Sequence, residues 1–483
     1  MRTYDRLFIG GEWVPSTGAS TIDVISPATE QVIGHAPEAT VDDVNRAVRA
    51  ARVAFDEGEW PRMAPSKRAE HLTALARAYE PHVGEMAALV TEEMGCPISY
   101  GQIGQAFVGV MIIDSGVKLA AGYAWEQLRR GDMADTLVRR MPVGVVAAIV
   151  PWNMPQLSAL TKMVPALLAG CTVVLKPAAE TPVDALRLAE IIEEVGFPKG
   201  VINIVTGGRA VGEHLIRHPE VDKVTFTGST ETGRHIASVC GQQLKRVSLE
   251  LGGKSAAIVL DDADVGVMVE SLRLVSFANN GQACVAQTRI LAPRSKYDAV
   301  VDAVAGLASS LRVGDPADPT TEIGPLVTRR QQERVEKYIA AGQEEGARLV
   351  VGGSGMPEGI DTGWYVRPTV FADVDSRMRI AQEEIFGPVL SIIRYEDVDD
   401  AVRIANDSRY GLAGTVWTSD VTRGMDVARQ IRTGSIGINQ YIPDFAAPLG
   451  GWKDSGIGRE GGPEGIDQYV ELQSLLPGPS VST

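Results

Sequence analysis

The stretch VGVVAAIVPWNMPQLSALTKMVPALLAGCTVVLKPAAETP, residues 143–182, decides the fold class. Val143–Val150 is a continuous apolar run typical of a buried strand, Pro155–Ala169 has a helical pattern, and Thr172–Leu175 is a second strand. Strands that alternate with helices at this spacing predict βαβ units and a parallel sheet. Such sheets bind ligands at the carboxyl ends of their strands, so the residues that follow each strand become candidates for a site.

The alternation continues along the chain after this stretch. It predicts a helix, a strand, a helix, a strand and a further helix at Val183–Val195, Val201–Val205, Ala210–Arg217, Lys223–Phe226 and from Ser229. A second α/β stretch begins with the strand Ser255–Leu260, continues with a helix capped by Asp262, and runs to about Gly434. The sequence therefore predicts two α/β domains, each built on a parallel sheet.

Other segments break this alternation. Leu7–Thr40 has short β-like runs, and Val41 to about Ala124 is helical in pattern. Gly122–Met141 does not fit βαβ units, and the strand-like tail Tyr469–Leu476 has no partner nearby in sequence. We interpret these last two segments as one small β unit that is available for contacts between subunits.

Composition limits the class of protein. The chain has 483 residues, 45% apolar and 22% charged, which is ordinary globular composition and suggests about three domains. Its 46 basic and 61 acidic residues give a net charge of −15 without a basic cluster, so no nucleic-acid partner is expected. No signal peptide and no apolar run of about 18 residues is found, so no membrane partner is expected. Four scattered cysteines favour a reducing compartment, and we expect a cytoplasmic protein.

Three side chains at predicted strand ends or loops are candidates for covalent chemistry. Cys284 lies in the loop GQAC, where an activated thiol could act as a nucleophile. Glu250, in ELGGK, ends a run of strand character and precedes two glycines, as a mobile general base would. Asn153, held between prolines in PWNMP, could donate to an oxyanion. Each also has an ordinary structural interpretation: a small buried thiol, a surface carboxylate and a turn residue. That interpretation is kept for the remaining cysteines, Cys96, Cys171 and Cys240.

Two further motifs are candidates for nucleotide recognition. In FTGSTETG, Gly228 makes a turn after a strand and Ser229 opens a helix, whose free N–H groups could face a pyrophosphate. In EEIFGP, residues 383–388, a carboxylate could hold the diol of a ribose or cap a helix. Three other patterns are rejected because their context or spacing is wrong: G-x-G-x-x-G at 456–461, GGKS at 252–255, and the pair His214 and His218 as metal ligands. No metal site is predicted.

Together these motifs resemble the NAD(P)-dependent aldehyde dehydrogenase superfamily, of the hydrolytic, non-acylating type. LFIGGEW, PWNMP, KPAAETP, FTGSTETG, ELGGK, GQAC, EEIFGPV and PLGGWKDSGIGRE occur in the family's order across nearly the whole chain. The resemblance implies an α/β fold with a dinucleotide-binding domain at residues 1–122 and 143–252 and a catalytic domain at 253–435. It also implies an oligomerisation unit at 123–142 and 464–483, and a homodimer or homotetramer.

The resemblance assigns roles to individual residues. Cys284 matches the catalytic thiol, Glu250 the general base and Asn153 the oxyanion donor, while Lys162 and Glu460 match positions proposed to relay protons. The positions that match cofactor contacts are Trp152, Lys176, Gly207, Gly208, Gly228, Ser229, Gly252, Glu384 and Phe386. Two positions depart from the family pattern: Ala179 replaces the usual ribose-binding acid, and Leu449 replaces the usual phenylalanine. NAD is the expected cofactor, and NADP remains possible because of Ala179.

The implied reaction is oxidation of an aldehyde to a carboxylic acid. The thiolate of Cys284 attacks the aldehyde, and Glu250 activates the water that hydrolyses the resulting thioester. The alternatives are a CoA-acylating semialdehyde dehydrogenase and a non-catalytic NAD-binding protein of this fold. By alignment to the family motifs, the aldehyde tunnel carries no charged and no aromatic residue, which predicts a medium-to-large hydrophobic aldehyde. These tunnel positions are Met154, Leu157, Ser158, Thr161, Ala283, Val285, Pro443 and Leu449.

Overall fold

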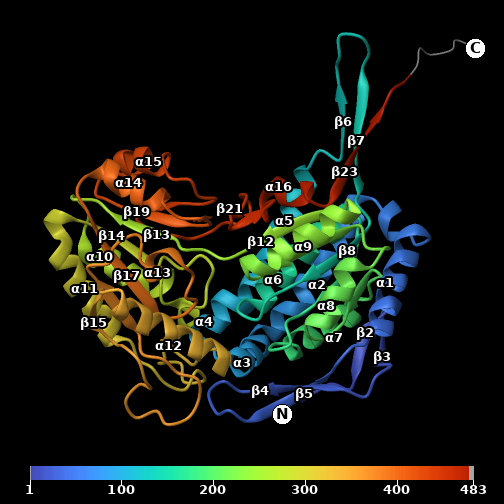
Figure 1. Ribbon diagram of the computed structural model, residues 1–483. Helices are drawn as coiled ribbons and strands as arrows, with labels where there is room; N and C mark the ends of the chain where they lie inside the picture. The colour runs from blue at the N-terminus through green and yellow to red at the C-terminus, as the bar shows by residue number, and fades with distance from the viewer. Residues whose placement is uncertain (1, 478–483) are drawn as a thin grey trace, which may run out of the picture.

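The computed structural model describes residues 2–477 and has two α/β lobes with a β unit that projects from one of them (Figure 1). The lobe formed by the first half of the chain is built on an eight-stranded sheet, and the second lobe on a seven-stranded sheet. Two lobes on mixed but largely parallel sheets confirm the predicted α/β class.

The eight-stranded sheet has five parallel strands at its centre and antiparallel strands at both edges. Because the five central strands run in the same direction, their carboxyl ends lie together at one edge of the sheet. In order, the strands are β22 (Gly456–Ile457), β12 (Arg246–Glu250), β11 (Lys223–Thr227), β8 (Val145–Ile149), β9 (Thr172–Lys176), β10 (Ile202–Ile204), β2 (Arg6–Ile9) and β3 (Glu12–Pro15).

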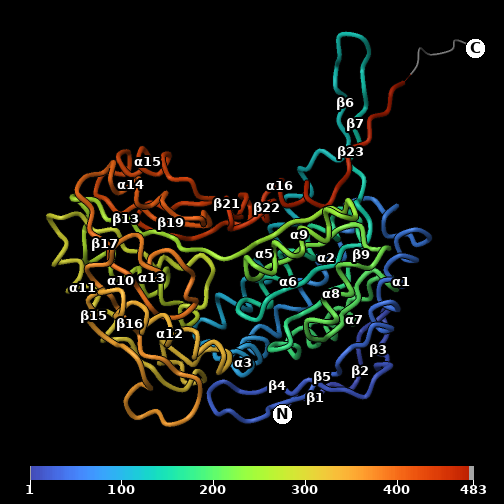
Figure 2. Tube along the Cα trace, viewed as in Figure 1, coloured from blue at the N-terminus to red at the C-terminus, as the bar shows by residue number. Residues whose placement is uncertain are grey.

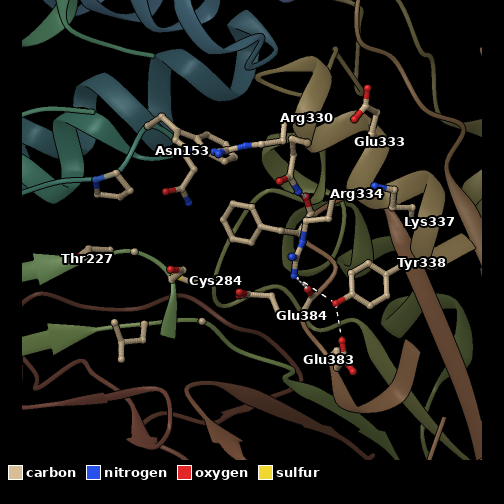
Figure 3. A pocket seen from close by; sticks show the side chains of 18 of the residues that line it. Asn153, Thr227, Cys284, Arg330, Glu333, Arg334, Lys337, Tyr338, Glu383 and Glu384 are labelled. Carbon is tan, nitrogen blue, oxygen red and sulfur yellow. Dashed lines mark hydrogen bonds between the residues drawn. The ribbon is translucent and has the colours of Figure 1, made fainter. Parts of the chain in front are cut away.

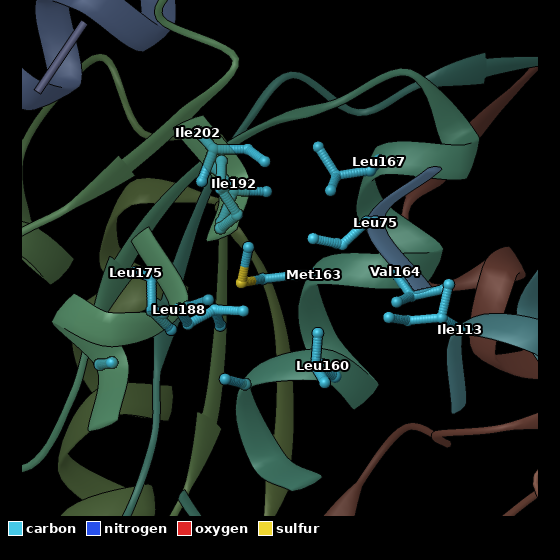
Figure 4. Packing of buried hydrophobic residues seen from close by; sticks show 14 of the residues in the cluster. Leu75, Ile113, Leu160, Met163, Val164, Leu167, Leu175, Leu188, Ile192 and Ile202 are labelled. Atoms are coloured by element: carbon cyan, nitrogen blue, oxygen red, sulfur yellow. The ribbon is translucent and has the colours of Figure 1, made fainter. Parts of the chain in front are cut away.

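Both faces of this sheet are buried, which explains the continuous apolar run of β8. Val146 and Ala148 belong to the core on one face, while Val145 and Ala147 belong to the core on the other. Figure 4 shows the first core, where Leu160, Met163 and Leu167 of α6 meet side chains of neighbouring helices. The helices of the lobe are α1 (Val41–Asp56), α2 (Pro65–Tyr79), α3 (Val83–Met94), α5 (Val108–Gly122), α6 (Pro155–Ala169), α7 (Val183–Val195), α8 (Arg209–Arg217) and α9 (Thr230–Gln243).

The seven-stranded sheet is parallel except for its edge strand β15. Its order is β15 (Arg348–Val351), β16 (Thr369–Ala372), β17 (Val389–Tyr395), β14 (Arg289–Pro293), β13 (Ala256–Val259), β19 (Gly414–Trp417) and β20 (Gly437–Ile438). β20 lies beyond residue 435, where this domain was predicted to end. The helices are α10 (Val265–Val275), α11 (Tyr297–Ser310), α12 (Arg329–Glu344), α13 (Arg379–Gln382), α14 (Val398–Asn406) and α15 (Val421–Ala428).

The prediction that Asp262 caps α10 is wrong. The cap is Asp264, whose carboxylate accepts the backbone N–H groups of Gly266 and Val267 at 2.9 and 3.1 Å. Asp262 instead accepts hydrogen bonds from Thr418 and forms an ion pair with Arg423. Asp262 and Asp264 are both suitable N-cap residues by type and position. The contacts of Asp262 with Thr418 and Arg423, which are distant in sequence, leave Asp264 as the cap.

The projecting unit joins the two segments that break the βαβ alternation. Strand β7 (Thr136–Pro142) pairs with β6 (Glu126–Arg129) on one side and with β23 (Val470–Leu475) on the other, both antiparallel. α16 (Gly462–Asp467), just before β23, packs on α5 and α6 of the first lobe. Figure 2 shows β4 (Thr21–Ile25) and β5 (Val32–Pro37) running along the opposite side of the molecule, where β5 also pairs with β1 (Arg2–Thr3).

One helical stretch, Ile98–Gly122, is long and apolar enough to cross a membrane by length and composition. It consists of α4 (Ile98–Tyr100), the π-helical turn Gly101–Phe107 and α5. Because α5 packs against α2 and α6 in the first lobe, and core helices pass the same test, this stretch is weak evidence for a membrane span.

Candidate active site

A cavity of about 710 Å³ lies where loops of both lobes meet. The first lobe contributes residues that follow β8, β11 and β12 at the carboxyl ends of these strands, as expected for a parallel sheet. Figure 3 shows Asn153, Thr227 and Cys284 on one side and residues of α12 on the other. Of the residues singled out from the sequence, the lining contains Trp152, Asn153, Gly228, Ser229, Glu250, Gly252, Cys284, Glu384 and Phe386.

The loop that carries Cys284 is held by two asparagines in left-handed conformation. Asn279 and Asn280 have φ values of 55° and 61°, which asparagine tolerates better than most residues. The amide of Asn280 donates to the carbonyls of Gly95 and Pro325, both at 2.8 Å. Since both asparagines are buried, these bonds fix the backbone that leads to the thiol.

Asn153 is locked to this loop through its own amide. Its Nδ2 donates to the carbonyl of Gln282 at 2.9 Å, and its backbone carbonyl accepts from Asn279 and Gln105 at 2.8 and 2.7 Å. An amide nitrogen carries two N–H groups, so one of them remains for an oxygen in the cavity that Asn153 lines. The geometry suits an oxyanion donor, because the side chain cannot turn away without breaking these bonds.

The thiol of Cys284 is protonated at neutral pH in this arrangement. Burial and, after it, the negative charges of Glu384, Glu250 and Glu460 together raise its pKa to about 12. The other three cysteines are fully buried, whereas Cys284 is partly exposed to the cavity. A nearby base or a cationic ligand is therefore needed to form the thiolate.

Glu250 belongs to a buried charge cluster. Its pKa is raised well above the usual value, first by burial and then by Glu460, while Lys162 opposes the shift. Lys162 is fully buried and donates to Glu460 Oε1 at 2.5 Å and to Thr227 Oγ1 at 2.6 Å. A Cβ on Gly450 would lie 2.6 Å from Glu250 Oε1, so only glycine leaves room for this carboxylate. A carboxyl with a raised pKa beside a second acid and a lysine is suited to moving protons.

Glu384 reaches the cavity through a gap that Gly252 leaves. Its carboxylate accepts the N–H of Gly253 at 2.9 Å, and a Cβ on Gly252 would lie 2.3 Å from the same carboxylate. Burial raises the pKa of Glu384 to about 7, while Gly253, Arg334 and Lys254 oppose that shift. Because the oxygens of a carboxyl group can accept hydrogen bonds from two hydroxyls, Glu384 suits the ribose role.

Gly252→Ala is expected to displace the Glu384 carboxylate and to raise KM for NAD about tenfold, which corresponds to about 1.4 kcal/mol. The turnover number should change much less, because Cys284 is not displaced. Initial rates at varied NAD measure both constants. Gly241→Ala is the control, since a Cβ there meets no atom within 4 Å. An unchanged KM for NAD in Gly252→Ala would contradict the role of Glu384.

The remaining cofactor candidates fall into two groups. Ser229 caps α9 by accepting the N–H of Thr232, so the start of this helix faces the cavity. The rings of Trp152 and Phe386 meet edge to face, 5.4 Å apart. Outside the cavity lining are Lys176, whose Nζ donates to the Pro177 carbonyl at 2.7 Å, and the two glycines Gly207 and Gly208. Their roles stay predictions.

Sequence reasoning missed the contribution of α12. This helix lines the cavity with several long polar side chains, and Gln331 donates to the carbonyl of Phe386 at 2.7 Å. Arg334 donates to the carbonyl of Glu384 and so supports the loop from the other side. The helix is rich in charge and resembles an ordinary solvated surface helix, so no local signal distinguishes it. Its lining residues are Arg330, Gln331, Glu333, Arg334, Lys337, Tyr338 and Ala341.

None of the eight predicted tunnel residues lines this cavity. Ser158 and Thr161 are buried in α6, and Pro443 is exposed. Met154 is contacted by Gln105, whose Nε2 lies 3.2 Å from the thioether sulfur. The side chain of Leu449 packs against the core of the first lobe, and its backbone pairs with that of Glu460.

The chain was compared with known proteins. The sequence profile of the Aldehyde dehydrogenase family matches residues 13–475. A geranial dehydrogenase of Castellaniella defragrans is 49% identical over 474 residues, which cover 98% of each chain.

Solved structures give the same result. An aldehyde dehydrogenase of Mycobacterium tuberculosis complexed with NAD+ has a TM-score of 0.97 and 48% identity, covering 100% of this chain and 99% of that one. A mutant aldehyde dehydrogenase C of Pseudomonas syringae, in complex with NAD+ and octanal, has a TM-score of 0.95 and 39% identity. That match covers 98% of this chain and 96% of the other.

Proposed function

Because the chain belongs to the aldehyde dehydrogenase family, we propose that it oxidises a hydrophobic aldehyde to a carboxylic acid through a thioester on Cys284. The observation that carries the proposal is that Cys284, Asn153 and Glu250 line one cavity although they lie far apart in sequence. A nucleophile, an oxyanion donor and a base around one space are the parts that acyl transfer requires.

Cys284 carries out the first step. Its thiolate attacks the aldehyde carbon, and the free N–H of Asn153, together with the backbone N–H of Cys284, stabilises the negative oxygen. The thiol must lose its proton before this attack, because its pKa is raised to about 12. Formation of the thiolate therefore requires a base or a positive charge in the cavity.

The residues present suit NAD. The gap at Gly252 admits the carboxylate of Glu384 for a ribose diol, and the N-terminus of α9 faces the same space for a pyrophosphate. When bound, NAD supplies the hydride acceptor. The chain's residues orient it: the Trp152–Phe386 pair gives an apolar wall, and Gln331 and Arg334 fix the loop that carries Glu384.

Glu250 completes the reaction by activating water against the thioester. The hydrogen-bonded Glu460–Lys162 pair, whose charges act on Glu250, would carry the proton away from the cavity. CoA could replace water in an acylating enzyme, but a base at Glu250 favours hydrolysis.

NADH formation with an aldehyde, measured with and without CoA, tests the proposal. Independence from CoA supports hydrolysis, CoA dependence indicates acylation, and no NADH with any aldehyde would contradict enzymatic function.

Ala179→Glu is expected to lower the NADP-to-NAD ratio of kcat/KM about tenfold, because a carboxylate repels a 2′-phosphate. Ala179 lies in the turn after β9, next to Glu180, whose charge already acts on Lys176. Steady-state rates with both cofactors measure the ratio. Ala179→Gln adds the same bulk without charge and should change the ratio less. Equal ratios in the two variants would show that charge at position 179 does not select the cofactor.

A hydrophobic substrate is supported by the surroundings of Met154 and by two relatives. The helical stretch that contacts Met154 exposes Ile103, Phe107 and Met111 at a spacing of four residues, near one helix face. The similar proteins act on geranial or hold octanal, according to their names. An exposed apolar face next to Met154 would favour long apolar chains over charged aldehydes.

In a series of straight-chain aldehydes, kcat/KM is expected to rise about fourfold per methylene from two carbons toward eight, since each buried methylene contributes about 0.8 kcal/mol. Rates at low substrate concentration with saturating NAD measure the series. Phe107→Ser should flatten it, whereas Met425→Ser, at an exposed methionine on α15, should leave it unchanged. A maximum at two carbons or a preference for betaine aldehyde would overturn the substrate class.

We also propose a cytoplasmic homo-oligomer. All four cysteines are free, which is consistent with a reducing compartment. The projecting β unit exposes Leu128, Met133 and Leu472, and its outer strand β6 leaves a free edge that a second copy can cover. Light scattering on the full chain and on Leu128→Lys tests this, and a wild-type monomer would contradict it.

A further inference from the structure

A second, small cavity of about 20 Å³ lies in the catalytic lobe, at the amino ends of β13, β14 and β19. It is lined by Lys254 and Ser255, which follow the ELGGK glycines, and by Arg289 at the start of β14. Thr433 and Arg432 close it from the segment before β20. This volume fits one particle of the size of a water molecule or a halide ion.

Three polar side chains that line this cavity have no hydrogen-bond partner within residues 2–477. They are Lys254 Nζ, Ser255 Oγ and Thr433 Oγ1, and the three residues are 1%, 4% and 8% exposed. Unpartnered polar groups are costly to bury, most of all an ammonium group. Three unpartnered donors on residues that line one cavity therefore indicate a bound species that accepts hydrogen bonds.

The charges around the cavity distinguish an anion from a cation. Among the described lining residues, Lys254, Arg289 and Arg432 are cationic and none is acidic. The guanidinium of Arg289 donates to the carbonyls of Lys254, Ile404 and Ala405 at 2.9–3.0 Å. Within residues 2–477 it is hydrogen-bonded to no carboxylate, and only the more distant charge of Asp407 acts on it. From this charge balance and this size we propose that the cavity binds a single halide-sized monovalent anion.

The titration of Lys254 supports an anion over a neutral water molecule. Burial and the charge of Arg289 together lower the pKa of Lys254 to about 7, whereas Glu384 and Glu383 act in the opposite direction. An anion beside Nζ stabilises the ammonium form, while a water molecule leaves its charge uncompensated. Lys254 directly follows Gly253, whose N–H donates to the carboxylate of Glu384.

Bromide diffraction tests the site directly. Crystals of the full chain grown in sodium bromide are expected to show an anomalous peak within hydrogen-bond distance of Lys254 Nζ and Thr433 Oγ1. The peak should disappear in Lys254→Met and weaken in Thr433→Val, which keeps the lysine and the side-chain shape. Ordered density without an anomalous signal would identify a water molecule and overturn the proposal.

Thermal unfolding gives an independent measurement in solution. At constant ionic strength, replacing gluconate by chloride should raise the Tm of the wild type in a saturating way, by about 2 °C or more, because a ligand bound only to the folded state stabilises it. Lys254→Met should lose this response, and Lys67→Met, at an exposed lysine of α2, should keep it. Equal responses in all three proteins would overturn the proposal, whether or not the enzyme is active.

Discussion

Cys284→Ala is expected to lower NADH formation by at least about 10⁴-fold while NAD binding stays within a few-fold of the wild type. The substitution removes the nucleophile, and no other described thiol can replace it because Cys96, Cys171 and Cys240 are fully buried. The asparagines that fix the loop keep their hydrogen bonds, so the cavity is preserved. NADH fluorescence in turnover and titration of the protein with NAD measure the two effects separately.

The control is Cys240→Ala, which removes a thiol from α9 at a distance from the cavity lining. It should keep most of the turnover, with a modest loss of stability from the small cavity it leaves. A Cys240→Ala enzyme without turnover, or a Cys284→Ala enzyme with wild-type turnover, would show that the nucleophile is assigned wrongly.

The parallel sheets could be predicted because their signal is local. Val145–Ile149 is buried on both faces, so every position in that run is apolar and the strand is visible without its partners. Pro155 and Gly170 mark the ends of α6, and both act through backbone geometry that the sequence shows directly. Because the ends of such strands are visible in the sequence, the side chains that follow them could also be predicted as candidates for a site.

The rest depends on contacts between distant segments. Glu460 reaches the cluster of Glu250 through a backbone pair with Leu449 and an ion pair with Lys162, almost 300 residues away. α12 enters the cavity only because the second lobe folds against the first, and its charged pattern matches any exposed helix. No sequence pattern connects residues this far apart. Glu460 was therefore predicted only from the resemblance to a family, and the contribution of α12 was not predicted.

Glu250→Gln is expected to slow the steady state by about 10²–10⁴-fold while the first turnover still produces NADH. Glutamine keeps the shape of the side chain next to Gly450 but cannot accept a proton, so the thioester on Cys284 accumulates. Stopped-flow fluorescence should therefore show a burst close to one NADH per site, followed by a slow phase. A wild-type steady-state rate would remove Glu250 from the mechanism.

The pH dependence separates the charge of Glu250 from its shape. Because burial and Glu460 raise its pKa, Glu250 keeps its proton to a higher pH than an ordinary glutamate, and deacylation should become faster as pH rises through that pKa. Glu460→Gln removes the neighbouring negative charge, so the rising limb of kcat should move to lower pH. Lys162→Met removes the opposing positive charge and should move the limb to higher pH. If both variants shift the limb in the same direction, direct electrostatic action of this cluster on the base is excluded.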